Sequence, residues 1–77
     1  MPKGLNNWSF RQVVKFLKSF SFQETHVRGS HHYYSGFYNN LPRMVTVPNH
    51  KQIKTGTMKG IVSQSGVPEK LWRNSNK

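Results

Sequence analysis

A pair of histidines beside a glycine is the part of this sequence best suited to chemistry. The stretch Arg28-Gly29-Ser30-His31-His32 brings together a guanidinium, a residue without a side chain and two imidazoles. Glycine lets a phosphate approach the backbone closely, and imidazole transfers protons near neutral pH. Arg28 can stabilise charge that develops on a phosphoryl group. The residues therefore suit phosphate chemistry, although a plain hairpin with two half-exposed histidines would have the same composition.

The chain has four histidines, His26, His31, His32 and His50, and they do not predict a metal site. Adjacent residues of a strand point to opposite faces, so His31 and His32 cannot easily share an ion. We expect no carboxylate nearby to orient them. Ser30 beside His31 is not a catalytic triad, because the chain contains no Asp. We expect neither a metal nor another cofactor.

A second group of candidate residues, Lys51, Lys54 and Lys59, surrounds the expected start of the second helix. Free N–H groups and the macrodipole at a helix N-terminus attract phosphate, and lysines around such an end strengthen the attraction. The alternative is a basic face that is simply solvated.

The middle of the chain is aromatic, with Tyr33, Tyr34, Phe37 and Tyr38 close together. These rings can stack unpaired bases, or one alternate set can line the core. Residues 32–42 contain no Lys, Arg, Asp or Glu. We therefore do not expect this segment to be the main surface that grips phosphates.

Charge and composition restrict the possible functions. The 77 residues carry a net charge of +10, which favours a polyanionic partner such as nucleic acid or an acidic protein. The only acids, Glu24 and Glu69, stand in different halves of the chain, which argues against two-metal nucleases and glycosidases. The absence of cysteine excludes thiol catalysis and favours a reducing cytoplasm. No apolar run or hydrophobic signal region suggests a membrane or export.

The hydrophobic pattern predicts an α+β fold in the order α-β-β-β-α(α). A capping box at Ser9 and Gln12 and helical spacing of apolar residues predict a helix over 9–20. Alternation and turn residues predict strands over 22–28, 31–38 and 43–47, which would form a three-stranded antiparallel sheet. The turns are expected at Gly29-Ser30 and over 39–42.

A second helix is expected to begin near Gly56-Thr57, capped by Thr55 or Thr57, and to end at Gly66. A short third helix should follow Pro68 and reach about residue 73, with Leu71 and Trp72 packed inward. We expect one domain over residues 1–77, with a core at about 9–73 and flexible ends at 1–7 and 74–77.

Three segments in this order resemble the HicA toxins, which are mRNA interferases of type II toxin–antitoxin systems. They are Arg28-Gly29-Ser30-His31-His32, Val45-Thr46-Val47-Pro48-Asn49-His50-Lys51 and Gly56-Thr57-Met58-Lys59-Gly60-Ile61-Val62-Ser63-Gln64-Ser65-Gly66. The resemblance covers about residues 9–73. It implies a fold similar to a double-stranded-RNA-binding domain, RNA cleavage without a metal, and inhibition by a cognate HicB antitoxin.

The resemblance also implies which residue is catalytic. The catalytic histidine of the family follows the Gly-Ser pair, which corresponds to His31, with His32 and His50 as further candidates. For RNA binding we select Arg28, Gly29, Ser30, Lys51, Lys54 and Lys59. The sequence analysis thus predicts a cytoplasmic endoribonuclease toxin, and the alternative is a non-catalytic RNA-binding module of the same fold.

Overall fold

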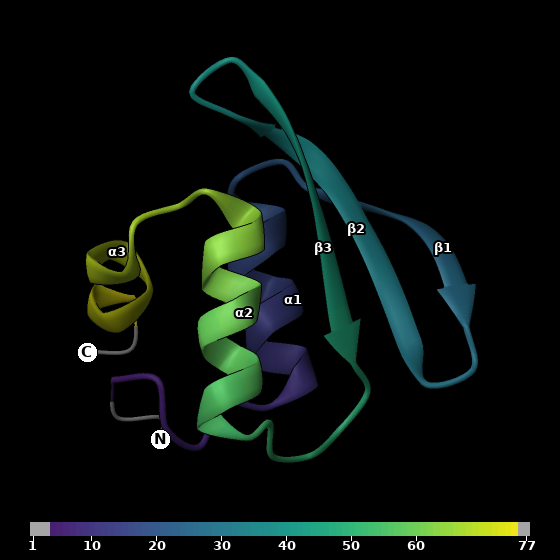
Figure 1. The fold of residues 1–77 in the computed structure, drawn as a ribbon, viewed down its shortest axis with the longest axis vertical. Coiled ribbons are helices and arrows are strands. Elements are labelled where there is room, and N and C mark those ends of the chain that lie inside the picture. Colours follow the sequence, from purple (N-terminus) through teal and green to yellow (C-terminus); the bar gives the residue numbers. More distant parts are fainter. Residues whose placement is uncertain (1–3, 76–77) are drawn as a thin grey trace.

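The computed structural model describes residues 4–75 and has the order of elements that the sequence predicts. The helix α1 (Phe10–Ser19) is followed by the strands β1 (Gln23–Arg28), β2 (His31–Tyr38) and β3 (Leu41–Pro48), and then by the helices α2 (Thr55–Ser65) and α3 (Glu69–Asn74). The three strands form one antiparallel sheet in the order β1-β2-β3. The predicted α+β class is confirmed (Figure 1).

Local sequence signals explain where the elements begin and end. The Ser9 hydroxyl accepts a hydrogen bond from the Gln12 N–H, and the Gln12 side chain accepts one from the Ser9 N–H, which is the expected capping box. Asn39 and Asn40 both have positive φ values, so two residues suffice to join β2 to β3. β3 therefore begins at Leu41, two residues earlier than expected. α2 ends at Gly66, which is left-handed as predicted.

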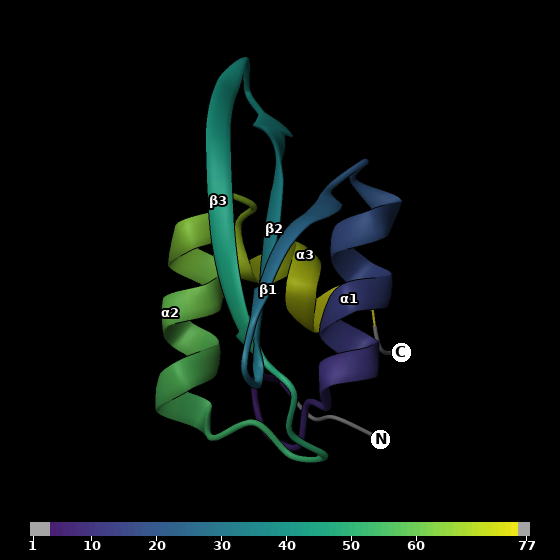
Figure 2. The same ribbon diagram turned by 90° about the vertical axis from the view of Figure 1, so that its right-hand side faces the viewer.

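The core lies between the helices and one face of the sheet. Trp72 stacks on Phe16 with 3.9 Å between ring centroids, and the edge of Trp8 meets Trp72 at 5.4 Å. The other fully buried large side chains include Leu17, Phe22, Ile53, Met58, Val45 and Val47. α2 runs beside β3, whereas the far end of the β2–β3 hairpin extends beyond the helices (Figures 1 and 2).

Two expectations about the termini were wrong where the structure describes them. Residues 4–7 are not a loose arm: Leu5 is buried, and the Gly4 carbonyl accepts a hydrogen bond from the Trp8 indole. At the other end, Trp72 is buried as expected, but Leu71 is exposed because it lies on the outer side of α3. The expected flexibility at 1–3 and 76–77 falls outside the described residues.

The expected threonine cap of α2 was also wrong. Lys54 occupies the N-cap position and makes no capping hydrogen bond with its side chain. The Thr55 hydroxyl instead donates to Asn6 Oδ1 at 2.6 Å, so it ties α2 to the N-terminal segment. The first N–H groups of α2 consequently receive no side-chain cap from Lys54.

Candidate functional site

The turn between β1 and β2 places His31 in an exposed position. Gly29 has a φ of 61°, which glycine adopts without strain, so Gly29 and Ser30 alone connect the strands. His31 is the first residue of β2 and is paired with Arg28 across the sheet. Because cross-strand partners share a face, the Arg28 and His31 side chains lie on the same side of the sheet. Both are exposed.

The loop after β3 brings His50 to the same end of the sheet. The Asn49 N–H donates to the Ser30 carbonyl at 2.7 Å, which joins this loop to the Gly29–Ser30 turn. The His50 carbonyl accepts from the Phe10 N–H at 3.0 Å, so the first turn of α1 also holds the loop. Two backbone hydrogen bonds therefore fix the position of His50 relative to His31.

His31 and His50 line one surface hollow of about 410 Å³. One wall is the open face of β3, with Thr46 and Pro48, and the other is α2, with Thr57, Gly60, Ile61 and Gln64. Gln64 joins the two walls, because its Oε1 accepts a hydrogen bond of 2.9 Å from the Thr46 N–H. Thr46, Thr57 and Gln64 are not among the site residues predicted from the sequence. The four residues of α2 that line the hollow are spaced i, i+3, i+4, i+7 from Thr57, so they lie on one face of the helix. This periodicity is the sequence signal that could have identified them as a group.

His32 lies on the opposite face of the sheet from His31, as the alternation of strand residues predicts. Its Nδ1 is 2.6 Å from Glu24 Oε1, and its ring packs on Phe10 with 4.6 Å between centroids. We had expected no carboxylate near the histidines, and this was wrong: strand pairing brings Glu24 to His32 although eight residues separate them. His32 is thus built into the helix-facing side of the sheet.

Burial and the Glu24 carboxylate affect a neighbouring phenol. Tyr34 is buried on the helix-facing side of β2, and it is paired with Glu24 across the β1–β2 ladder. Burial, and then the nearby Glu24 carboxylate, raise the pKa of the Tyr34 hydroxyl above its usual value.

Cations lie near the hollow, although none of them lines it: Arg28 pairs with His31, Lys51 follows His50, and Lys59 precedes Gly60. Arg28, Lys51, Lys54 and Lys59 are all exposed. Within residues 4–75, Glu24 is paired with His32 and Glu69 is paired with Arg73. Because the chain has no other acidic side chain, these four cations have no carboxylate partner among the described residues. Electrostatically, this end of the molecule is suited to an anion.

A second hollow of about 360 Å³ adjoins the first, because His50 lines both. Lys51 and Asn49 line it from the loop, and Ser9, Phe10 and Arg11 line it from the start of α1. Arg11 is not among the candidate residues predicted from the sequence. Its position beside Lys51 depends on how α1 packs against the loop, which the sequence alone does not state.

Residues that could hold a metal do not gather in the described part of the chain. Among residues 4–75, no group of three or more His, Cys, Asp or Glu side chains lies close enough to hold an ion. No helix among the same residues is long and apolar enough to cross a bilayer.

The fold and the site define a small basic α+β domain in which two histidines line a hollow flanked by cations. A family model described as the "HicA toxin of bacterial toxin-antitoxin" matches residues 10–67. The chain belongs to this family, as the resemblance of its three segments indicated, and it is a toxin of a toxin–antitoxin system. The family implies an antitoxin as partner. Searches of curated proteins and of solved structures found no significant match.

Proposed function

We propose that this toxin is an endoribonuclease that cleaves mRNA in the cytoplasm and is inhibited by a cognate HicB antitoxin. The observation that carries the proposal is that His31 and His50 line the same hollow. Two imidazoles in one site can act as a general base and a general acid. Membership of the HicA family supports the toxin role, and the histidine pair supports the reaction.

The proposed reaction is a transphosphorylation within the RNA strand. His31, in its neutral form, removes the proton of a ribose 2′-hydroxyl. The 2′-oxygen then attacks the adjacent phosphorus, and the bond from phosphorus to the 5′-oxygen breaks. His50, in its protonated form, gives a proton to that 5′-oxygen. The products are a 2′,3′-cyclic phosphate and a free 5′-hydroxyl.

The surrounding cations support binding and charge stabilisation. Arg28 lies beside His31 across the β1–β2 ladder, where its guanidinium can stabilise the charged phosphorane. Lys51 and Lys54 lie on the loop that leads into α2, and Lys59 lies on α2 itself. In the proposed role, these lysines bind the phosphates that flank the cleaved bond. Gly29 and Ser30 leave the turn open for the RNA backbone to approach.

The experiment is cleavage of a labelled RNA by the purified protein in the presence of EDTA. We expect cleavage without added metal and 2′,3′-cyclic phosphate ends on the upstream product. A 5′-phosphate on the downstream product would instead indicate direct hydrolysis. RNA binding without cleavage by the wild-type protein would favour the alternative, a non-catalytic RNA-binding module, and would refute the enzyme.

A further inference from the structure

The open face of the sheet carries an apolar surface at the end of the molecule away from the turn that holds His31. Phe37 and Met44 are 70% and 60% exposed, and Pro42 is exposed between them. Phe37 pairs with Pro42, and Met44 pairs with Ser35, so all three residues share one face. We call Phe37, Pro42 and Met44 the hairpin patch.

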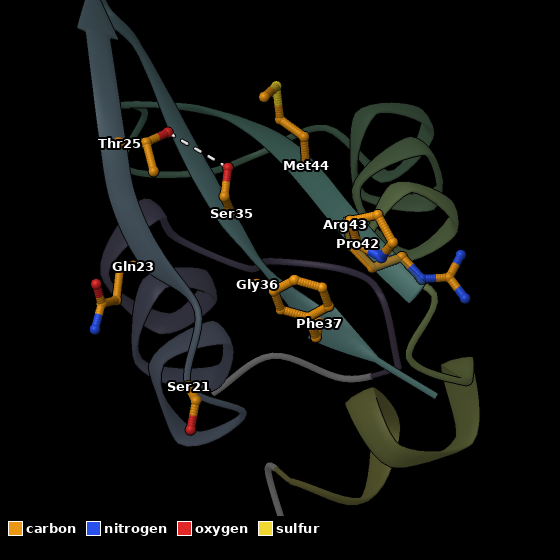
Figure 3. A pocket seen from close by; sticks show the side chains of 9 residues that line it. All are labelled: Ser21, Gln23, Thr25, Ser35, Gly36, Phe37, Pro42, Arg43 and Met44. Carbon is orange, nitrogen blue, oxygen red and sulfur yellow. Dashed lines mark hydrogen bonds between the residues drawn. The ribbon is translucent and has the colours of Figure 1, made fainter. Parts of the chain in front are cut away.

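A groove adjoins this patch and gives it depth. Its volume is about 530 Å³, enough for a large side chain of a partner. Thr25 and Ser35 form the polar floor, where their hydroxyl oxygens lie 3.4 Å apart, and Phe37 and Met44 stand on either side (Figure 3). Exposed apolar side chains beside such a groove are typical of a protein-binding surface.

Charge distinguishes between the partners that could occupy the groove. Residues 29–42 contain no Lys, Arg, Asp or Glu, whereas nucleic acid binds through phosphate contacts with cations. A second copy of this chain would bring another +10 charge to the same surface and be repelled. The hairpin patch therefore favours a protein other than the toxin itself.

The cation at the end of the open face indicates the charge of that protein. Arg28 lies on the open face beside His31, whereas Arg43 pairs with Gly36 and so points to the helix-facing side, where its guanidinium approaches Gly66 at the end of α2. Glu24 is paired with His32 on the opposite face, and Glu69 is paired with Arg73 on α3. A complementary partner presents apolar side chains to the groove and a carboxylate to Arg28.

We propose that the antitoxin docks on the open face of the sheet, with the hairpin patch as its apolar anchor. His31 and Phe37 are six residues apart on β2 and on the same face, which is about 20 Å along a strand. An antitoxin of ordinary interface size spans that distance, so a protein anchored at Phe37 also covers His31. This inference rests on the proposed function, because it explains how the antitoxin closes the proposed site.

The test uses the purified toxin and its purified cognate antitoxin. The variants Phe37→Ser and Met44→Ser should each weaken the affinity measured by calorimetry at least about 30-fold, as expected for an interface hot spot. Leu71→Ser is the matched control, because Leu71 is an exposed apolar residue on α3, outside the patch. It should change the affinity less than about threefold, and all three variants should keep the wild-type melting temperature and RNA cleavage.

Three outcomes overturn the inference. If the patch variants bind the antitoxin as tightly as Leu71→Ser does, the anchor lies elsewhere. If they lose RNA cleavage together with antitoxin binding, the open face belongs to the RNA. If the wild type alone is a dimer in sedimentation, the patch is a contact between toxin copies. A toxin that binds antitoxin at the patch but cuts no RNA would refute the proposed enzyme and leave the docking surface intact.

Discussion

Replacing each of the two adjacent histidines by alanine separates catalysis from stability. His31 is exposed, and within residues 4–75 its side chain makes no hydrogen bond or ion pair. His32 is packed against Phe10 and paired with Glu24 on the other face. His31→Ala should therefore remove a reacting group without loosening the fold, and His32→Ala should do the reverse.

The contacts give the expected magnitudes. An exposed substitution changes the free energy of unfolding by no more than about 0.5 kcal/mol, so His31→Ala should shift the melting temperature by less than about 4 °C. For His32→Ala, the partly exposed ion pair contributes about 0.2–1 kcal/mol and the ring contact with Phe10 about 0.5–1.5 kcal/mol. A loss of about 1–2 kcal/mol corresponds to a fall of about 4–16 °C for a domain of this size.

The assay measures initial cleavage rates on one labelled RNA beside thermal melting of the same preparations. His31→Ala should reduce the rate by a factor of about 10²–10⁴, the usual contribution of a positioned base, and should bind RNA with nearly unchanged affinity. A His31→Ala variant that cuts at the wild-type rate would refute the reasoning. A dead His32→Ala variant with an unchanged melting temperature would move the catalytic role by one residue.

Three further predictions concern binding and stability. If about four phosphates are engaged, the logarithm of RNA affinity should fall with the logarithm of salt concentration at a slope near −3. Lys54→Ala and Lys59→Ala should each make this slope shallower by about 1. A slope near zero in filter binding would contradict the prediction. Burial and Glu24 raise the pKa of Tyr34 in the folded state, so its contribution to the free energy of unfolding is fully present below about pH 10 and is lost as the pH rises further. In denaturant titrations, Tyr34→Phe should show a smaller fall in the free energy of unfolding over that pH range. Asn40→Val should lower the free energy of unfolding by about 1–2 kcal/mol, since Asn40 has a φ of 62°; an unchanged urea midpoint would be inconsistent with that turn.

The fold was predictable because its boundaries depend on neighbouring residues. The reciprocal hydrogen bonds of Ser9 and Gln12, the left-handed Asn39 and Asn40, and the glycine that ends α2 each act within three or four residues. The predicted limits of β2 agree with the structure, because its alternation is bounded by a turn on each side. The end of β1 at Arg28 follows from the same Gly29–Ser30 turn.

The candidate site was predictable only in part. Alternation along a strand was enough to place His31 and His32 on opposite faces, but it does not say which face the helices cover. The Glu24 contact that holds His32 was missed, because it depends on pairing between strands and not on spacing along one strand. Likewise, an apparently loose N-terminal segment proved to contribute Leu5 to the core.

The sequence by itself determined a basic α+β chain with an exposed histidine after a glycine turn, because charge, alternation and turn chemistry are local properties. Only the tertiary structure decided that His50, nineteen residues further on, shares a hollow with His31. The hydrogen bond from Asn49 to Ser30 and the contact of Gln64 with Thr46 make that arrangement. Such contacts join segments whose separation in sequence carries no periodic signal, so they arise only when the sheet and the helices pack together.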